Sequence, residues 1–479
     1  MTHALLISLY DLGHQPYELL QLDAALTKAG AESSIIDLSI TDVSILNTYE
    51  NEVTHAVIAV PMHTAARLSL SVMDLISRWK VVPNITLMGH YAEALSSFTL
   101  PKEVRTFAAG EAIDRIVDSI LGDDDPTVTA GEESTPTHIN TTRTSLRLKG
   151  IDAPLNRQKL PPLSKYTSYI NGETMEIAGY VEASRGCLHL CTHCPVAATY
   201  KGRIRINSET SVLREIENLH AMGARHITFG DPDFFNAPIH SIKVLEEASK
   251  SLPDLTFDAT IKVSHILKYK ELVPRLSQNN TSFIVSAFEH TSAAVLEALE
   301  KGHSVSDMVE ALNIVRSTGI EIRPSLLPFT PWTTLDSLVE LLDFVADNDL
   351  IESIDPVMYS IRLLVPSSSI TFNRYPELFT EGEDRGLNLE WKSQSPVLDE
   401  LQLEISNIAE ASQTLSNLHT FEKIYSVVSS AAKRPPRSIF FNSERNVPRL
   451  TESWYCCAEP TTSMTSAVSS VQKRSSCEK

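Results

Sequence analysis

Three cysteines lie close together in the stretch EASRGCLHLCTHCPVAATYKGR, which covers residues 182–203. They are Cys187, Cys191 and Cys194, and the whole chain of 479 residues has only six cysteines. Thiolates with this spacing can bind one metal centre together. A cubane iron–sulfur cluster usually has four cysteine ligands, one for each iron, so a set of three leaves one iron open. The spacing therefore predicts a cluster that binds a small molecule at its open iron.

The open iron indicates a particular chemistry. It can chelate the amino and carboxylate groups of S-adenosylmethionine and so place the sulfonium beside an electron donor. One-electron reduction would then cleave a carbon–sulfur bond and release a 5′-deoxyadenosyl radical, which abstracts hydrogen from unactivated carbon. The alternative is a structural zinc ion, for which His189 or His193 could supply the fourth ligand. Zinc motifs usually divide their cysteines into two separated pairs, which favours the cluster.

The elements that position these cysteines form two alternating series of strands and helices. In residues 1–122, β-rich apolar runs such as ALLISLY and HAVIAVP alternate with amphipathic helical patterns. This alternation predicts a parallel sheet covered on both faces, which is a Rossmann-like domain. Residues 123–165 are polar, contain proline and lack periodicity, so we expect a linker there.

The second series extends over residues 166–375. Its strand candidates are AGYVEAS, HITFGD, LTFDAT, SFIVSAF, IEIRPSLL and VMYSIRLLV. Six such units are too few for a closed eightfold barrel and predict a partial (β/α)6 barrel, with the cysteines after its first strand. Residues 376–435 have a helical pattern, and residues 436–479 form a Ser/Thr-rich tail that we expect to be flexible. The predicted fold class is α/β.

The motif RGCLHLCTHC, on the first strand of a six-unit partial barrel, resembles the radical S-adenosylmethionine (SAM) superfamily. The resemblance covers residues 175–370. It implies that Cys187, Cys191 and Cys194 hold a [4Fe-4S] cluster, that SAM is the cofactor, and that an external donor such as flavodoxin or ferredoxin supplies electrons. The superfamily usually has an aromatic residue before the last cysteine, where this chain has His193.

Polar residues follow the predicted barrel strands and resemble, by position, the superfamily's contacts with the amino acid, ribose and carboxylate of SAM. The cofactor-binding candidates are Gly230, Asp231, Asp258, Ser286, Glu289 and Arg323. Asp233, Lys262 and Arg362 stand at similar positions. Each has a structural alternative, since Asp233 could cap the next helix and Arg362 could belong to a buried ion pair.

The N-terminal domain resembles the cobalamin-binding domain of one large radical SAM subgroup. AAGEAIDRIVDSI is similar to that subgroup's final strand and turn, with Gly110 and Glu111 matching. Cobalamin is therefore a candidate cofactor. The D-x-H-x-x-G sequence that displaces the lower ligand of cobalt is absent, and His14 instead stands three residues after Asp11. The domain could bind cobalamin with its lower face empty or could keep only the fold, and a surface loop is the default environment of His14.

Two further cysteines, Cys456 and Cys457, are adjacent in ESWYCCAEPTT. Adjacent thiols bridge each other poorly, but they can share a soft metal or metalloid or cycle between dithiol and strained disulfide. The string resembles the ending of the CUAEP/CCAEP-tail radical SAM (seleno)proteins, in which Cys457 would stand where some members have selenocysteine. This implies a reactive, catalytic pair. Without the resemblance the pair would be incidental, as we expect for Cys477.

Charge and hydropathy exclude several function classes. The net charge of −19 argues against a surface that binds nucleic acid or anionic lipid. No window has the roughly 18 apolar residues that a membrane helix needs, and the N-terminal apolar run lacks a basic leader. We therefore expect a cytoplasmic radical SAM enzyme that acts on a small-molecule or peptide substrate. The competing hypothesis is a non-catalytic zinc- or cluster-bearing protein that binds or senses a ligand.

Overall fold

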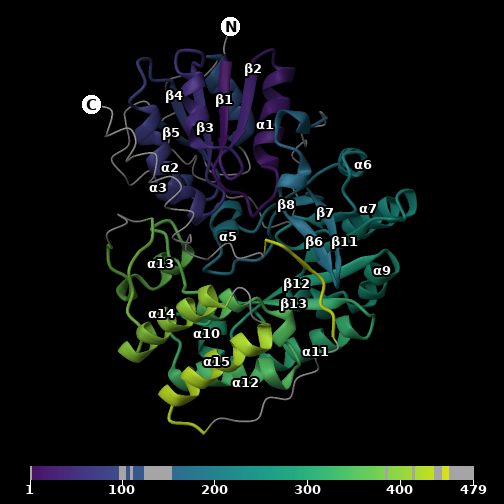
Figure 1. Ribbon diagram of the computed structural model, residues 1–479, viewed down its shortest axis with the longest axis vertical. Coiled ribbons are helices and arrows are strands. Elements are labelled where there is room, and N and C mark those ends of the chain that lie inside the picture. The colour runs from purple at the N-terminus through teal and green to yellow at the C-terminus, as the bar shows by residue number, and fades with distance from the viewer. Residues whose placement is uncertain are drawn as a thin grey trace, which may run out of the picture.

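The computed structural model describes residues 3–95, 104–107, 112–122, 154–382, 387–412, 416–435 and 445–452. Figure 1 shows an N-terminal sheet at the top, in purple and blue, and a second sheet with its helices below it, in teal and green. The predicted residues Gly110, Glu111, Cys456, Cys457 and Cys477 lie outside the described residues.

The N-terminal sheet has five parallel strands in the order β2-β1-β3-β4-β5. Alternate side chains of β1 enter different cores: Leu5 and Ile7 pack with α2 and α3, whereas Ala4 and Leu6 pack with α1 and α4. A sheet buried on both faces explains the continuous apolar runs in the sequence. The strands are His3–Ser8 (β1), Glu32–Asp37 (β2), His55–Ala59 (β3), Asn84–Met88 (β4) and Val104–Phe107 (β5), and the helices are Tyr17–Lys28 (α1), Val43–Tyr49 (η1), His63–Ile76 (α2), Ala92–Leu95 (α3) and Ala112–Leu121 (α4).

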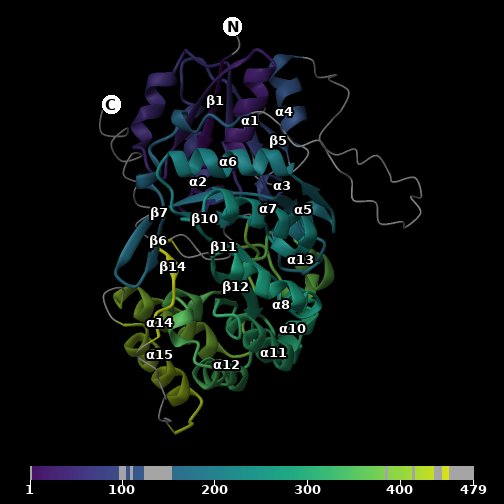
Figure 2. The ribbon, with the colours of Figure 1, turned by 90° about the vertical axis from the view of Figure 1, so that its right-hand side faces the viewer.

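The second sheet has seven strands in the order β13-β12-β11-β10-β7-β6-β14. Within this sheet, β7, β10, β11, β12 and β13 are parallel, while β6 and β14 extend it in antiparallel pairing. Figure 2 shows the β6–β7 hairpin with the short β14 beside it. These strands are Ser168–Asn171 (β6), Thr174–Val181 (β7), His226–Phe229 (β10), Thr256–Thr260 (β11), Thr281–Glu289 (β12), Glu321–Leu326 (β13) and Arg449–Leu450 (β14).

Helices follow the parallel strands and cover the sheet, as Figure 2 shows for α6 and α7. The helices of this part are Pro195–Tyr200 (α5), Glu209–Ala221 (α6), Phe234–Asn236 (η4), Pro238–Ser251 (α7), Val263–Lys268 (α8), Lys270–Leu272 (η5), Val273–Gln278 (α9), Ala293–Ala298 (α10), Val305–Arg316 (α11) and Leu335–Asp347 (α12). The observed α/β class with a curled, partial barrel confirms the predicted fold class.

The sixth predicted barrel strand, VMYSIRLLV, is not a strand. Residues Pro356–Ser360 form a 3₁₀ helix (η7), and after it a single bridge joins Arg362 to Phe329. Five parallel strands therefore carry the barrel in the described part of the chain. Short apolar runs are ambiguous in sequence, because burial favours the same residues in a strand and in a packed turn.

The C-terminal helices pack against the barrel. Leu398 and Leu401 of α14 and Phe421 and Val428 of α15 belong to the same buried cluster as the barrel strands. Figure 1 shows both helices, in yellow-green, beside α12. The elements are Ile351–Ser353 (η6), Ile370–Arg374 (α13), Pro376–Leu378 (η8), Pro396–Ala411 (α14) and Asn417–Ala431 (α15). No helix in the described ranges is both long enough and apolar enough to cross a membrane.

The predicted linker is described from residue 154 onward, and there it packs against both sheets. It contains the 3₁₀ helices Arg157–Lys159 (η2) and Leu163–Lys165 (η3). The buried Arg157 pairs with Glu215 at 3.1 Å and donates hydrogen bonds to the Gln15 side chain at 3.1 Å and the Tyr180 carbonyl at 3.0 Å. One guanidinium therefore connects the N-terminal domain, the linker and the barrel.

Candidate functional site

The three clustered cysteines lie in a loop closed by a short antiparallel ribbon. Its strands, Ser184–Gly186 (β8) and Ile204–Ile206 (β9), precede and follow the cysteines. The backbone N–H of Cys194 donates to the Cys191 carbonyl at 3.2 Å, and Pro195 then begins α5. Gly186 has a φ of +80°, and a Cβ there would lie 2.4 Å from the Arg203 carbonyl, so the ribbon requires glycine at this position.

All three cysteines line one cavity of about 290 Å³ between the two sheets. This volume is near the lower end of small-molecule sites, roughly 300 Å³. The barrel contributes residues from the carboxyl ends of its strands, among them Gly230, Lys262 and Glu289. The N-terminal domain contributes Asp11, Leu12, Tyr17, Glu18, Pro61, Met62 and His90.

The surroundings of the thiols suit metal binding. Burial, followed by the charge of Asp233, raises the pKa of Cys187 to about 11, and a bound cation would favour its thiolate. The Lys262 ammonium lies 3.6 Å from the Cys191 sulfur, where it can balance thiolate charge. The described residues include no other cysteine, so three thiols line this cavity. This donor set fits a cluster with one open iron.

Glu289, a predicted cofactor contact, lines the cavity at the end of β12 but has other partners. Its carboxylate accepts a hydrogen bond from Lys301 at 3.0 Å and lies 3.3 Å from the His193 ring. The nearby positive charge of Lys301 holds the pKa of Glu289 below its usual value despite burial. Its backbone φ is +62°, an uncommon conformation for a residue with a side chain. Glu289 thus fixes His193, the residue before the last cluster cysteine.

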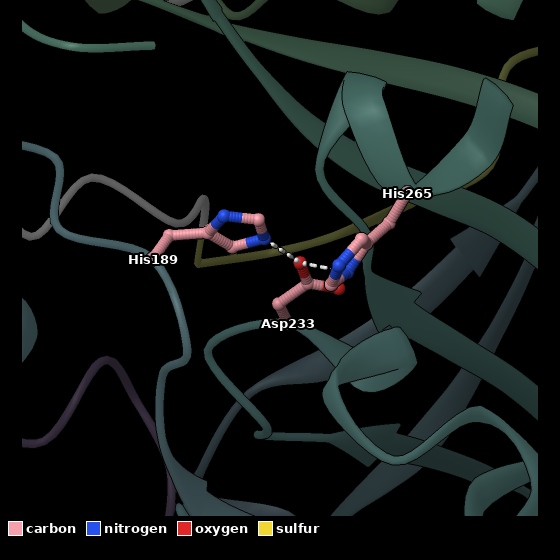
Figure 3. A group of neighbouring side chains, drawn as sticks. All are labelled: His189, Asp233 and His265. Atoms are coloured by element: carbon pink, nitrogen blue, oxygen red, sulfur yellow. Dashed lines mark ion pairs between the residues drawn. The ribbon is translucent and has the colours of Figure 1, made fainter. Parts of the chain in front are cut away.

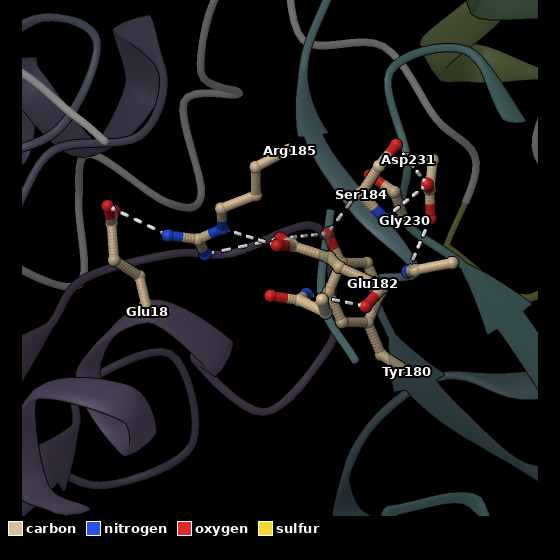
Figure 4. Close-up of polar contacts among 9 residues, drawn as sticks. Glu18, Tyr180, Glu182, Ser184, Arg185, Gly230 and Asp231 are labelled. Atoms are coloured by element: carbon tan, nitrogen blue, oxygen red, sulfur yellow. Dashed lines mark hydrogen bonds and ion pairs between the residues drawn. The ribbon is translucent and has the colours of Figure 1, made fainter. Parts of the chain in front are cut away.

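Asp231 holds the backbone that leads into the cysteine loop, as Figure 4 shows. Its carboxylate accepts hydrogen bonds from the N–H of Ala183 at 2.9 Å and from the N–H and hydroxyl of Ser184, both at 2.6 Å. Burial raises its pKa to about 7, against the effect of these donors. Asp231 is not among the cavity-lining residues, so the structure gives it a positioning contact rather than an opening to a ligand.

Gly230 lines the cavity and packs directly under the Tyr180 ring. A Cβ at residue 230 would lie 1.9 Å from the ring carbon that bears the hydroxyl. The Tyr180 hydroxyl donates to Glu182, whose carboxylate pairs with Arg185, and Arg185 also pairs with Glu18 of the N-terminal domain at 3.2 Å (Figure 4). The absence of a side chain at Gly230 therefore allows an ion-pair chain that joins the two domains beside the cavity.

We expect Gly230→Ala to lower the free energy of unfolding by about 1–3 kcal/mol, because the added methyl group overpacks against the Tyr180 ring. Urea unfolding followed by circular dichroism would measure this. Gly382→Ala is the matched control, since the three heavy atoms nearest to a Cβ there all belong to the flexible side chain of Glu390. Equal losses in the two variants would contradict the close-approach explanation.

Four other predicted residues have their polar groups away from the cavity. Asp258 accepts hydrogen bonds from Thr228 at 2.6 Å and contacts His226 at 2.8 Å. Arg323 pairs with Asp355 at 2.8 Å. Ser286 is fully buried, and Arg362 pairs with Asp399 at 2.6 Å. None of these four residues lines the cavity in the described structure, whereas Gly230, Glu289 and Lys262 do.

The structure brings residues to the site that sequence reasoning did not select. Lys301 lies in the cavity wall, and Arg185 and Glu18 connect the domains there. His265, on α8, contacts Asp233, which also caps η4 through the N–H of Phe235. No spacing in the sequence relates these residues, because they lie on separate elements.

His14 has a buried position rather than one in a surface loop. Its side chain is 5% exposed and its ring centroid lies 4.9 Å from that of Tyr180. It is not a cavity-lining residue. Burial lowers its pKa to about 3, so the ring is neutral at physiological pH. The default expectation of a surface histidine was therefore wrong, because the barrel covers this loop.

Residues 181–345 match the family model of the radical SAM superfamily. Among curated proteins, the ribosomal protein uS12 methylthiotransferase RimO of Clostridium botulinum (strain Langeland / NCTC 10281 / Type F) is 24% identical over 183 residues, which cover 36% of this chain and 41% of that protein. RimO of Chlorobium chlorochromatii (strain CaD3) is 23% identical over 220 residues, or 42% and 49% of the two chains. The alignments thus span less than half the length of these relatives.

Two solved structures share the fold over more of the chain. The cobalamin-dependent S-adenosylmethionine radical enzyme OxsB, with aqua-cobalamin and S-adenosylmethionine bound, has a TM-score of 0.64 at 14% identity, covering 90% of this chain and 71% of that one. The radical S-adenosylmethionine methyltransferase TsrM from Kitasatospora setae, with cobalamin and a [4Fe-4S] cluster bound, has a TM-score of 0.55 at 17% identity, covering 73% and 71%.

The family match and the site geometry agree on the same part of the molecule. The matched residues begin at the end of β7, include all three cysteines and reach into α12. The cavity that these cysteines line lies at the carboxyl ends of the parallel strands, where such folds place their chemistry. Residues 181–345 are therefore similar to the radical SAM superfamily in sequence, and they contain all three clustered cysteines.

Proposed function

We propose that this chain is a radical SAM enzyme whose cluster is held by Cys187, Cys191 and Cys194. When bound, the [4Fe-4S] cluster supplies an electron and an open iron for SAM. The observation that carries the proposal is the convergence of the three cysteines on one cavity at the strand ends. Lys262 and Lys301 supply positive charge beside the sulfur ligands, and Glu289 orients His193.

Anaerobic reconstitution with iron and sulfide tests this proposal. We expect brown protein with about four irons and four sulfides per chain, and 5′-deoxyadenosine on addition of dithionite and SAM. Flavodoxin or ferredoxin should replace dithionite as the electron donor. Colourless protein that binds zinc, with no nucleoside release, would instead support a non-catalytic binding or sensor protein.

We propose that cobalamin binds at the N-terminal domain, at the edge of its sheet that borders this cavity. The support is that loops after β1, β3 and β4 of that domain line the cavity together with the cysteines. At this edge of the sheet the backbone of Gly89 also lies close to that of Val60, since a Cβ at Gly89 would lie 2.6 Å from the Val60 carbonyl. Hydroxocobalamin added during reconstitution should remain with the protein at about one per chain after gel filtration. Its complete loss would show that the domain keeps only the fold.

Methyl transfer is the reaction class that a bound corrinoid would favour, with a small molecule or a peptide as the acceptor. TsrM is a methyltransferase and RimO a methylthiotransferase, which supports this class without assigning the acceptor. The net charge of −19 argues against a nucleic acid as the acceptor. Transfer from SAM carrying a labelled methyl group to protein-bound cobalamin, followed by absorbance and mass spectrometry, would test the class.

We further propose that the chain belongs to the CCAEP-tail group and that Cys456 and Cys457 are reactive at the cavity. The support is positional. Glu452 contacts Tyr10 and packs against Gly13, next to the cavity residues Asp11 and Leu12. Cys456 follows Glu452 by four residues, and an extended chain of that length spans at most about 14 Å.

Iodoacetamide labelling tests the reactive pair. We expect Cys457 to be alkylated about tenfold faster than Cys477, which corresponds to a thiol pKa about one unit lower. Mass spectrometry of tryptic peptides from the holoprotein after short labelling times would measure both rates. Equal rates at the two cysteines would count against a catalytic role of the pair.

A further inference from the structure

Three side chains from separate elements meet beside the cysteine loop. His189 belongs to that loop, Asp233 follows β10, and His265 lies on α8; Figure 3 shows all three pointing toward one another. His265 Nδ1 lies 2.7 Å from Asp233 Oδ2, and His189 Nε2 lies 3.3 Å from the same oxygen. One ligand atom of each residue lies within 4.8 Å of the other two.

These atoms are buried and poorly satisfied by protein neighbours. Asp233 is 1% exposed and His265 is 6% exposed. Asp233 Oδ2, His265 Nδ1 and His189 Nε2 all lack a hydrogen bond of normal geometry in the described structure. A buried polar atom without such a bond is uncommon in a folded protein, and a bound ion is one of its ordinary explanations. Here three such atoms lie within 4.8 Å of one another.

The donor set and its spacing suit a divalent transition metal. Two imidazole nitrogens and one carboxylate oxygen are ligands for ions such as Zn²⁺, Fe²⁺ and Co²⁺. Ligands about 2.1 Å from an ion lie about 3.0–3.4 Å from one another in octahedral or tetrahedral geometry. The two nitrogens lie 2.7 and 3.3 Å from Asp233 Oδ2, and all three atoms lie within 4.8 Å of one another, so small side-chain shifts would give this geometry. The second carboxylate oxygen of Asp233 accepts the N–H of Phe235 at 3.0 Å, which orients the first oxygen.

We propose that His189, Asp233 and His265 bind one divalent transition-metal ion, distinct from the site of the three cysteines. His189 and Asp233 also line the cavity, so the remaining coordination positions open toward it. The alternative is a hydrogen-bonded His–Asp–His group with no ion. The metal site does not depend on the proposed enzyme activity, because its ligands are separate from the cysteines.

Cobalt(II) is the probe, since its ligand-field absorption reports imidazole and carboxylate coordination. The parent is the full-length chain with Cys187→Ala, Cys191→Ala and Cys194→Ala, which removes the cluster ligands. We expect it to bind about one Co²⁺ under anaerobic conditions, and His265→Gln or Asp233→Asn to weaken binding by about 100-fold or more, since even supporting residues of metal sites contribute 10–100-fold. His220→Gln is the matched control, because His220 pairs with Asp254 at 2.9 Å on the surface without a third ligand.

A second measurement covers the case in which the parent variant does not fold. Cluster-loaded wild-type protein is incubated with Co²⁺, passed through gel filtration, and analysed for cobalt and iron. We expect about one cobalt per chain beside an unchanged iron content, and loss of the cobalt alone in His265→Gln. Absence of cobalt from the wild type, or equal cobalt in wild type and His265→Gln, would overturn the proposal. Neither measurement uses nucleoside release. A failure of the metal proposal can therefore be distinguished from a failure of the proposed enzyme activity.

Discussion

Cys191→Ala is expected to leave the reconstituted protein nearly colourless and to lower 5′-deoxyadenosine release by about 100-fold or more. Cys191 is 7% exposed, the most buried of the three clustered cysteines, and its sulfur lies 3.6 Å from the Lys262 ammonium. Removal of this ligand leaves two sulfur atoms to hold the cluster and an ammonium without its anionic partner. Iron and sulfide analysis and a chromatographic assay with dithionite and SAM would measure both effects.

Cys477→Ala is the control for that variant, because it removes a cysteine to which no role is assigned. It should keep the iron content and nucleoside release of the wild type. Cys187→Ala and Cys194→Ala should behave like Cys191→Ala, since each removes one of three ligands. Wild-type iron and nucleoside release in any of these three variants would refute the assignment of the cluster.

Lys301→Met is expected to reduce the free energy of unfolding by about 3–5 kcal/mol, which is the usual cost of leaving one member of a buried ion pair alone. The side chains of Lys301 and Glu289 are 4% and 10% exposed, and they lie 3.0 Å apart. Without Lys301 the Glu289 carboxylate would keep only His193 as a nearby partner. Urea unfolding of the metal-free chain would measure the loss without a contribution from the cluster.

Two comparisons make that prediction specific. The double variant Lys301→Met/Glu289→Gln should recover much of the stability, because no charge is then left buried and unpaired. Lys243→Met removes an exposed lysine that pairs with Glu209 at 2.7 Å, and it should have little effect because water screens surface pairs. A loss in Lys243→Met as large as in Lys301→Met would contradict the buried-pair explanation.

Local sequence pattern predicted the features that depend on neighbouring residues. The apolar runs of β1, β3 and β4 predicted a sheet buried on both faces. In such a strand apolar residues occupy consecutive positions and do not alternate with polar ones. The spacing of Cys187, Cys191 and Cys194 predicted a shared metal site, and all three line one cavity because they lie in one loop and need no distant element to bring them together. The sixth strand was wrong because a short apolar run does not distinguish a strand from a packed 3₁₀ turn.

The cofactor contacts show what local pattern could not decide. Gly230 and Glu289 line the cavity as expected for such contacts, whereas Asp231, which follows β10, and Asp258 and Arg323, which lie inside β11 and β13, bond to other protein groups. Side chains one residue apart on a strand point to opposite faces, so a shift of one position exchanges a cavity contact for a structural one. The position of a residue in the sequence therefore does not show whether its side chain faces the cavity or another protein group.

The sequence by itself thus determined the α/β class, and it predicted the three clustered cysteines as the metal ligands. Only the tertiary structure decided which charged groups face the cavity and which satisfy one another. Lys301, in the loop after α10, meets Glu289 at the end of β12, and His189, Asp233 and His265 come together from two loops and a helix. Such contacts depend on how the elements pack, because burial forces each charged or polar atom to find a partner wherever the fold provides one.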